Sequence, residues 1–155
     1  MKWFFAICVP IGMMLLFYFT KARFSEAPEI SSSEIREMQN SKEWANRYIV
    51  VDVRAKVESD VSVIPGAITK SEFEKNSQKH HGKVVIAYCT VGYRSGIYAN
   101  QLTTKGWEAY NYKGSILDWC KNQLPLVTPD GTETNRVHTY NSSYKVSEGY
   151  EAIYE

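Results

Sequence analysis

Two short runs of apolar residues constrain the fold of this chain most. They cover 48–53 (YIVVDV) and 83–88 (KVVIAY), and both are rich in the β-branched residues that form strands buried on both faces. Helical patterns precede the first run and follow the second, and 107–112 alternates aromatic and polar residues as a further strand does. Strands that alternate with helices predict an α/β fold with a mainly parallel sheet flanked by helices.

Local signals place the helices around these strands. Ser31 and Glu34 form a capping-box pair, which predicts that a helix begins there. A second helix is expected over 95–105, because Gly106 stands where a C-terminal glycine belongs, and a third over 114–122. Between the strands, 64–68 (IPGAI) reads as a turn that leads into a short extended piece.

The N-terminal segment has a different composition from the rest. Fifteen of the 17 residues over 3–19 are hydrophobic and none is charged, whereas Lys2, Lys21 and Arg23 flank the run. As a helix it would span roughly 25 Å, the short end of what crosses a bilayer. We therefore expect a single-pass membrane anchor, with a cleaved signal peptide as the alternative. Basic residues balance at the two ends, so they predict no orientation.

Charge and cysteine content exclude several classes of protein. Residues 24–155 carry 15 Lys and Arg against 17 Asp and Glu, with no basic stripe, so no nucleic-acid partner is expected. Three cysteines, one of them Cys8 in the apolar run, do not suit a disulfide scaffold. His80 and His81 are adjacent, but no second Cys/His pair lies at ligand spacing, so we expect a solvated loop and no metal.

One motif carries chemistry. Residues 89–95 (CTVGYRS) lie between a predicted buried strand and a predicted helix, the position where open α/β sheets bind ligands. Backbone N–H groups of such a loop and the helix dipole lower the pKa of a cysteine and stabilise an anion. Cys89 is therefore the expected nucleophile, Gly92 allows a tight turn, and Arg94 adds a positive charge.

These segments resemble a single-domain rhodanese, a family of sulfurtransferases. The similarity follows the family's order over about residues 30–127, through the segments VDVR (51–54), IPGAI (64–68), YC with its loop to RSG (88–96), GW (106–107), GSI (114–116), Trp119 and LPL (124–126). The resemblance implies a rhodanese-like α/β domain that takes sulfane sulfur from a thiosulfate-like donor. Sulfur would be held as a Cys89 persulfide and passed to a thiol, protein cysteine or cyanide, with no cofactor. It also implies a substrate-binding loop made by Thr90, Val91, Gly92, Tyr93, Arg94 and Ser95.

The predicted organisation has four parts. Residues 1–23 form the anchor, 24–33 a tether, 34–127 the rhodanese-like domain, and 128–155 a turn-rich C-terminal appendage outside the common domain. Val63 departs from the family pattern, which often has His before the IPGA segment. Asp52 and Arg54 are expected to support the active-site edge by pairing with each other or with neighbouring loops, rather than to react.

Two other functions remain open. A docking or sulfur-carrying module could use the same pocket without turnover. Phosphatases and arsenate reductases of this fold have a loop one residue longer than the six residues from Cys89 through Arg94, and this loop contains no acid that could protonate a leaving group. Cys120 could resolve a Cys89 persulfide, but a buried structural thiol is the simpler interpretation.

Overall fold

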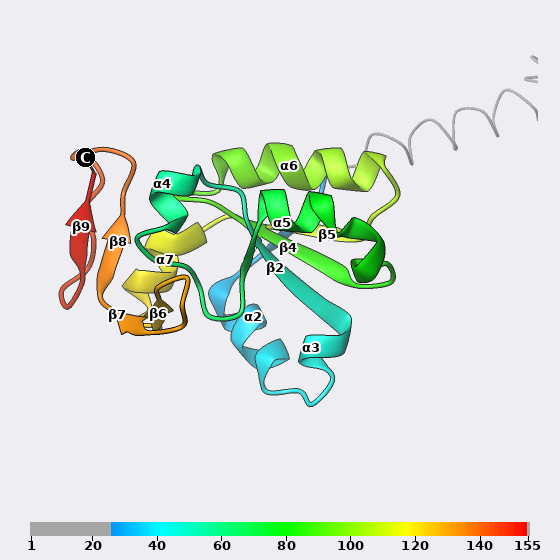
Figure 1. Ribbon diagram of the computed structural model, residues 1–155, viewed down its shortest axis with the longest axis horizontal. Coiled ribbons are helices and arrows are strands. Elements are labelled where there is room, and N and C mark those ends of the chain that lie inside the picture. The colour runs from blue at the N-terminus through cyan, green and yellow to red at the C-terminus, as the bar shows by residue number, and fades with distance from the viewer. Residues whose placement is uncertain (1–25, 155) are drawn as a thin grey trace, which may run out of the picture.

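The structure is a computed structural model that describes residues 26–154. At its centre is a five-stranded sheet with strand order β1–β5–β4–β2–β3, and every pairing in it is parallel (Figure 1). The strands are β1 (Glu29–Ile30), β2 (Tyr48–Asp52), β3 (Ile68–Thr69), β4 (Val84–Tyr88) and β5 (Ala109–Tyr112). The predicted parallel sheet is therefore confirmed, and the second apolar run forms its central strand.

Helices cover both faces of this sheet. They are α2 (Ser32–Gln39), α3 (Trp44–Arg47), α4 (Lys56–Ser59), α5 (Lys70–Lys75), the 3₁₀ turn η1 (Ser77–His80), α6 (Tyr93–Thr104) and α7 (Ser115–Lys121). One hydrophobic cluster joins the sheet to α5 and α6, and the other joins it to α2 and α7. In Figure 1, α5 and α6 lie above the sheet and α2 below it.

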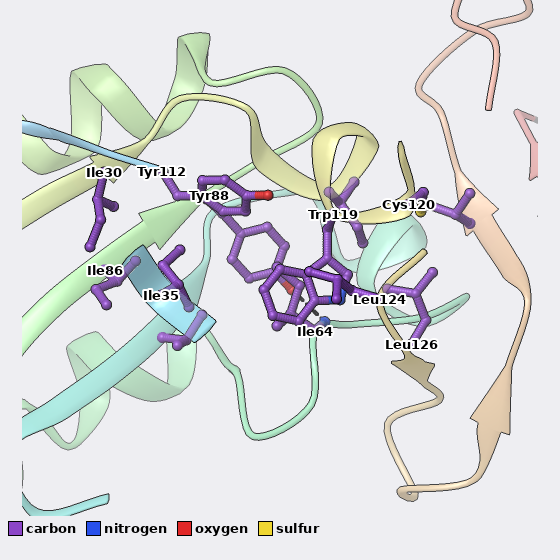
Figure 2. Packing of buried hydrophobic residues seen from close by; sticks show 13 residues of the cluster. Ile30, Ile35, Ile64, Ile86, Tyr88, Tyr112, Trp119, Cys120, Leu124 and Leu126 are labelled. Carbon is purple, nitrogen blue, oxygen red and sulfur yellow. Dashed lines mark hydrogen bonds between the residues drawn. The ribbon is translucent and has the colours of Figure 1, made fainter. Parts of the chain in front are cut away.

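Alternation along the strands creates these two clusters. In β4, Val85 and Ala87 face the first cluster, whereas Ile86 and Tyr88 face the second. All four side chains are fully buried, which explains why the run reads as continuously apolar. Figure 2 shows the second cluster, in which Trp119 packs near the aromatic rings.

Strand register brings the chemistry-bearing residues to one edge. Asp52, at the end of β2, pairs with Tyr88, at the end of β4. Cys89 follows immediately, at the carboxyl end of the central strand. This is the edge of a parallel sheet where ligand sites form.

The helix boundary signals correspond to the observed ends. Ser31 caps α2 as predicted: its hydroxyl accepts from the Glu34 N–H at 3.3 Å, and the Glu34 carboxylate accepts from the Ser31 N–H at 2.9 Å. Gly106 has φ +88°, and the Trp107 N–H donates to the Leu102 carbonyl at 3.0 Å, which closes the C-terminal turn of α6. Helix α6 begins at Tyr93, two residues before the predicted start, because Gly92 at its N-cap takes a left-handed conformation.

The predicted tether is partly sheet. Residues 29–30 form β1, which pairs with Asn111 and Tyr112 of β5, and α2 begins at Ser32. Ile30 is 4% exposed within the hydrophobic cluster of α2 and α7. A strand of two residues has too little periodicity to be seen in the sequence, since its position comes from pairing with β5.

The C-terminal residues form two small sheets. Strand β6 (Leu126–Val127) pairs antiparallel with β7 (Glu133–Thr134), and β8 (Arg136–His138) pairs parallel with β9 (Glu151–Ile153). Both sheets lie at one end of the domain, near α4 and α7 (Figure 1). Val137 is completely buried in the hydrophobic cluster of α2 and α7, so this segment completes the core.

The two adjacent histidines pack against aromatic rings. His80 stacks on Phe73 with 5.7 Å between the ring centroids, and His81 stacks on Trp107 at 5.1 Å. Burial and the nearby Lys83 and Lys79 charges lower the pKa of His80. These side chains therefore help to close the turn before β4.

The expected membrane anchor, residues 1–23, lies outside the described residues. Within residues 26–154, none of the helices combines the length and apolar character that a bilayer span requires.

Candidate active site

Cys89 is fixed by its own backbone at the end of β4. It is 1% exposed, and its N–H donates to the hydroxyl of Ser115 at 3.0 Å. Its carbonyl accepts from the Ile116 N–H at 3.1 Å, and the carbonyl of Thr90 accepts from the Leu117 N–H at 3.3 Å. The first amides of α7 therefore hold the start of the loop, and the Cys89 side chain is left for the groups that follow.

Hydrogen-bond donors converge on the sulfur. The Gly92 N–H donates to Cys89 Sγ at 3.1 Å, and the hydroxyls of Ser95 and Ser115 lie 3.6 and 3.8 Å from it. Burial of the thiol opposes ionisation, but hydrogen bonds from Ser95, Val91 and Gly92 outweigh it and lower the pKa of Cys89. The loop therefore stabilises a thiolate, the nucleophilic form of cysteine.

The shape of the loop requires glycine at position 92. Gly92 has φ +91°, and a Cβ at this position would overlap the backbone carbonyl of Lys113. Asn111, on β5, fixes the same turn: its Nδ2 donates to the Gly92 carbonyl at 3.1 Å, and its Oδ1 accepts from the Ser95 hydroxyl at 2.7 Å. Together these contacts direct the Gly92 N–H at the sulfur.

The charge of Arg94 is compensated by a buried acid. Arg94 donates through Nη1 and Nη2 to the two carboxylate oxygens of Glu58, at 2.6 and 2.8 Å, and through Nη2 to the Thr90 hydroxyl at 2.9 Å. Burial of Glu58 opposes its ionisation, but hydrogen bonds from Arg94 and the Ala55 N–H prevail and lower the pKa of Glu58 to about 2. Arg94 and Glu58 therefore form a charged pair at neutral pH, beside the Cys89 loop.

The predicted substrate-binding residues other than Arg94 take three different positions in the site. Gly92 and Ser95 face the sulfur, and the Val91 N–H contributes to it. The Thr90 hydroxyl donates to Oε1 of Glu58 at 3.1 Å. The side chains of Val91 and Tyr93 are 39% and 75% exposed, so they lie on the rim of the site.

Asp52 and Arg54 form a sealed pair behind the site. Arg54 donates through Nε and Nη2 to both Asp52 oxygens, at distances from 2.6 to 3.1 Å, and both side chains are completely buried. Arg54 Nη2 also donates to the Ser62 carbonyl at 2.6 Å. The Tyr88 hydroxyl donates to Asp52 at 2.8 Å and accepts from the Ile64 N–H at 3.2 Å, the dashed contact in Figure 2. The pair thus joins the ends of β2 and β4 to the 62–64 segment.

Four residues near the site had no predicted role. Glu58, Asn111, Ser115 and Tyr140 come from α4, β5, α7 and the C-terminal segment. Ser115 belongs to a segment on which the resemblance rests, and Glu58 stands three residues after Ala55, at capping-box spacing. Nothing in the sequence marks Asn111 or Tyr140, because only the folded sheet brings them to the loop.

Comparisons with known proteins identify the family of this domain. Residues 31–122 match the model of the family described as rhodanese-like domain. The chain is 30% identical over 93 residues to a sulfurtransferase of Allochromatium vinosum, an alignment that covers 54% of this chain and 81% of that protein. It is 37% identical over 68 residues to a tRNA sulfurtransferase of Desulfurococcus amylolyticus, covering 44% of this chain but only 14% of that much longer protein. A crystal structure of a rhodanese-like domain protein from Staphylococcus aureus superposes with a TM-score of 0.51 at 24% identity, over 59% of this chain and 90% of that one.

Proposed function

Because this chain belongs to the rhodanese-like domain family, we propose that it is a sulfurtransferase in which Cys89 carries sulfur as a persulfide. The observation that carries the proposal is the buried Cys89 sulfur on which the N–H groups of Val91, Gly92 and Ser95 converge. Such a cradle stabilises negative charge on the cysteine sulfur or on a second sulfur bonded to it. The sulfurtransferase names of two relatives favour the same chemistry.

The first step loads the enzyme. The Cys89 thiolate attacks the sulfane sulfur of thiosulfate, an S–S bond to Cys89 forms, and the S–S bond of thiosulfate breaks. Sulfite leaves with the electron pair, and the outer sulfur of the Cys89 persulfide carries the negative charge. No external oxidant or reductant is needed, because one S–S bond replaces another. The loop amides hold the charge that develops on sulfur.

The second step returns the enzyme to its starting state. An acceptor thiolate attacks the outer sulfur, a new S–S bond forms on the acceptor, and the persulfide bond to Cys89 breaks. The Cys89 sulfur receives the electron pair and is again a thiolate. The lowered pKa of Cys89 favours this step, because a more stable thiolate is a better leaving group.

A second candidate, phosphate-ester hydrolysis, is disfavoured by the acid nearest the loop. One structure with the same fold, from Rhodopseudomonas palustris, is titled a possible tyrosine phosphatase, at 17% identity and a TM-score of 0.54. Hydrolysis needs an acid that gives a proton to the leaving oxygen. Glu58 is held as a carboxylate by Arg94, with its pKa lowered to about 2, so it has no proton to give at neutral pH.

Mass spectrometry of the intact full-length protein tests the proposal. After treatment with thiosulfate, we expect an added mass of one sulfur atom that is absent in Cys89→Ser and removed by cyanide or a thiol. Absence of the adduct in the unsubstituted protein would contradict the enzyme function and favour a docking module. An aryl phosphate is assayed in parallel, and hydrolysis that depends on Cys89 would favour the phosphatase instead.

We also propose that residues 3–19 anchor the protein in a membrane. The proposal rests on the uncharged apolar run between Lys2 and Lys21. Tags at each end, combined with protease treatment of intact vesicles, report which side the domain faces. Release of the full-length protein from membranes by high salt would overturn the anchor.

A further inference from the structure

A tyrosine from outside the matched domain lies over the active-site arginine. The guanidinium carbon of Arg94 is 5.5 Å from the centroid of the Tyr140 ring, within the range of a cation–π contact. Tyr140 follows β8, whereas the family match ends at residue 122. The C-terminal segment therefore adds a side chain to a site that the rhodanese-like domain otherwise builds.

The backbone holds Tyr140 in place at an energetic cost. Its φ is +71°, a left-handed conformation that is unfavourable for a tyrosine. The preceding turn is fixed because the Tyr140 N–H donates to His138 Nδ1 at 3.0 Å and the Thr139 N–H donates to the Ile153 carbonyl at 2.8 Å. Since 61% of Tyr140 is exposed, burial of the ring does not account for this strained position.

The exposed surface around the Cys89 loop combines apolar and charged groups. Val91 and Tyr93 line a cavity together with Glu29 and Lys113, whereas Tyr140 contacts the loop through Arg94. Arg94 is paired with Glu58, so the loop offers a bound molecule no uncompensated arginine charge. The Tyr140 ring itself offers a small inorganic anion no attraction, whereas an organic thiol or persulfide can pack its carbon framework on the ring.

We propose that Tyr140 is a specificity-determining residue that binds the carbon framework of an organic thiol or persulfide whose sulfur reacts with Cys89. The assignment rests on the proposed sulfur transfer for the nature of the reaction, and on the geometry of Arg94 and Tyr140 for the binding. Tyr140 contacts the non-reacting part of the substrate, so it acts on binding and leaves the sulfur chemistry to the loop.

Neutral thiol-modifying reagents test this binding without turnover. The Cys89 thiolate attacks the sulfenyl sulfur of an alkyl methanethiosulfonate, a disulfide forms, and methanesulfinate leaves with the electron pair. The rates of the benzyl and methyl reagents are compared in the full-length protein, by mass spectrometry of the peptide that contains Cys89. Their ratio, divided by the same ratio for free cysteine, reports the preference for the carbon framework.

We expect Tyr140→Ala to lower this preference about fivefold, the effect of one lost aromatic contact, while Tyr140→Phe retains it. Tyr144→Ala is the matched control from the same segment, since Tyr144 is also part-exposed and no ring contact joins it to Arg94 among the described residues. An unchanged preference in Tyr140→Ala, or an equal loss in Tyr144→Ala or Tyr140→Phe, would overturn the assignment.

Steady-state kinetics extend the test to the reaction. With an organic thiol as acceptor, Tyr140→Ala raises KM and leaves kcat unchanged, whereas the KM for cyanide stays the same. An effect on kcat for both acceptors would indicate a damaged site and overturn a binding role. Failure of thiosulfate to load Cys89 would contradict the proposed function alone, because the reagent ratio is measured independently of turnover.

Discussion

Cys89 and Cys120 are both buried, with 1% and 0% of their surfaces exposed, yet their pKa values move in opposite directions. Burial in the hydrophobic core raises the pKa of Cys120 to about 12, with only small opposition from the Arg54 charge and its own backbone. Burial also acts on Cys89, but the donors of its loop reverse the result. Removal from water therefore does not decide the reactivity of a cysteine in this fold; the presence of oriented N–H and O–H groups does.

Replacement of each thiol in turn gives the largest expected effect. Cys89→Ser should lower sulfur transfer by about 1,000-fold or more, because the atom that carries sulfur is lost. Cys120→Ser should retain the transfer rate but lower the free energy of unfolding by about 1–3 kcal/mol, since it places a hydroxyl in an apolar site. Steady-state rates and urea unfolding measure the two effects. Equal losses of activity in both variants would mean that Cys120 takes part in the reaction.

Distortion of the Cys89 loop should abolish the difference in reactivity between Cys89 and Cys120. Gly92→Ala combines a left-handed alanine with overlap on the Lys113 carbonyl, so we expect a loss of about 3 kcal/mol in stability and about 10- to 100-fold in rate. Gly106→Ala is the control, because Gly106 has a similar φ of +88° with no atom near its Cβ position. It should cost about 1 kcal/mol and leave the rate unchanged. Similar rates in both variants would show that the Gly92 N–H does not serve the sulfur.

Removal of Glu58, the acid that compensates the charge of Arg94, should widen the difference in pKa between Cys89 and Cys120. In Glu58→Gln, Arg94 keeps its charge without a partner, which lowers the pKa of Cys89 further while Cys120 is unaffected. The pKa of Glu58 lies below that of a free carboxyl, so the pair stabilises the protein above about pH 4.5 and loses this effect as the pH falls toward about 2. We expect the free energy of unfolding of Glu58→Gln to be about 2 kcal/mol lower at pH 7. This loss is smaller than the loss from breaking a fully buried ion pair, because Arg94 is partly exposed.

Asp60→Asn is the control for this substitution. It breaks the exposed Lys56–Asp60 pair and should cost only about 0.3–0.5 kcal/mol. Stability of Glu58→Gln equal to that of the unsubstituted protein across pH 3–7 would show that the Glu58–Arg94 pair does not stabilise the fold.

The smallest expected effect comes from a substitution at Ser95, which narrows the difference in pKa between Cys89 and Cys120. Ser95→Ala removes a hydroxyl that lies 3.6 Å from the Cys89 sulfur and shares its one proton with Asn111 Oδ1, but it keeps the Ser95 N–H, so the pKa of Cys89 rises only part of the way toward its ordinary value. At pH 7 less thiolate is present, and alkylation by iodoacetamide should slow about fivefold, with the two proteins converging at high pH. Thr103→Ala on the same helix is the control: the Thr103 hydroxyl donates to the Asn100 carbonyl and not to the sulfur, so its loss should not change the dependence of the alkylation rate on pH. If the alkylation rate of Ser95→Ala reached its midpoint at a lower pH than that of the unsubstituted protein, the Ser95 hydroxyl would not stabilise the Cys89 thiolate.

The parallel sheet and the position of Cys89 were predictable, because buried strands and glycine-marked turns leave local signals. The apolar runs 48–53 and 83–88 became β2 and β4, and the capping pair Ser31–Glu34 is present as expected. Strand β1 was missed, since its two residues are placed by pairing with β5.

The site was predictable only as far as its loop. Arg94 was expected to add a positive charge, but its partner Glu58 lies 36 residues earlier in the chain, and such pairing follows from the tertiary structure. Asn111 and Ser115 reach the loop from β5 and α7 for the same reason. The buried faces of strands and helices produce a regular spacing of apolar residues in the sequence, but long-range polar contacts produce no such regular spacing.

The buried Val137 has a consequence for how this protein unfolds. Its strand lies beyond the family boundary at residue 122, yet it belongs to the same hydrophobic cluster as Ile86 and Trp119, and the Tyr150 hydroxyl donates to the Leu124 carbonyl at 2.6 Å. The amides of β8 and β9 should then exchange with solvent deuterium as slowly as other amides in cooperatively unfolding parts of the core. A shortened protein that ends at residue 127 would expose the patch that Val137 covers, so the unit that folds is longer than the unit that the family shares.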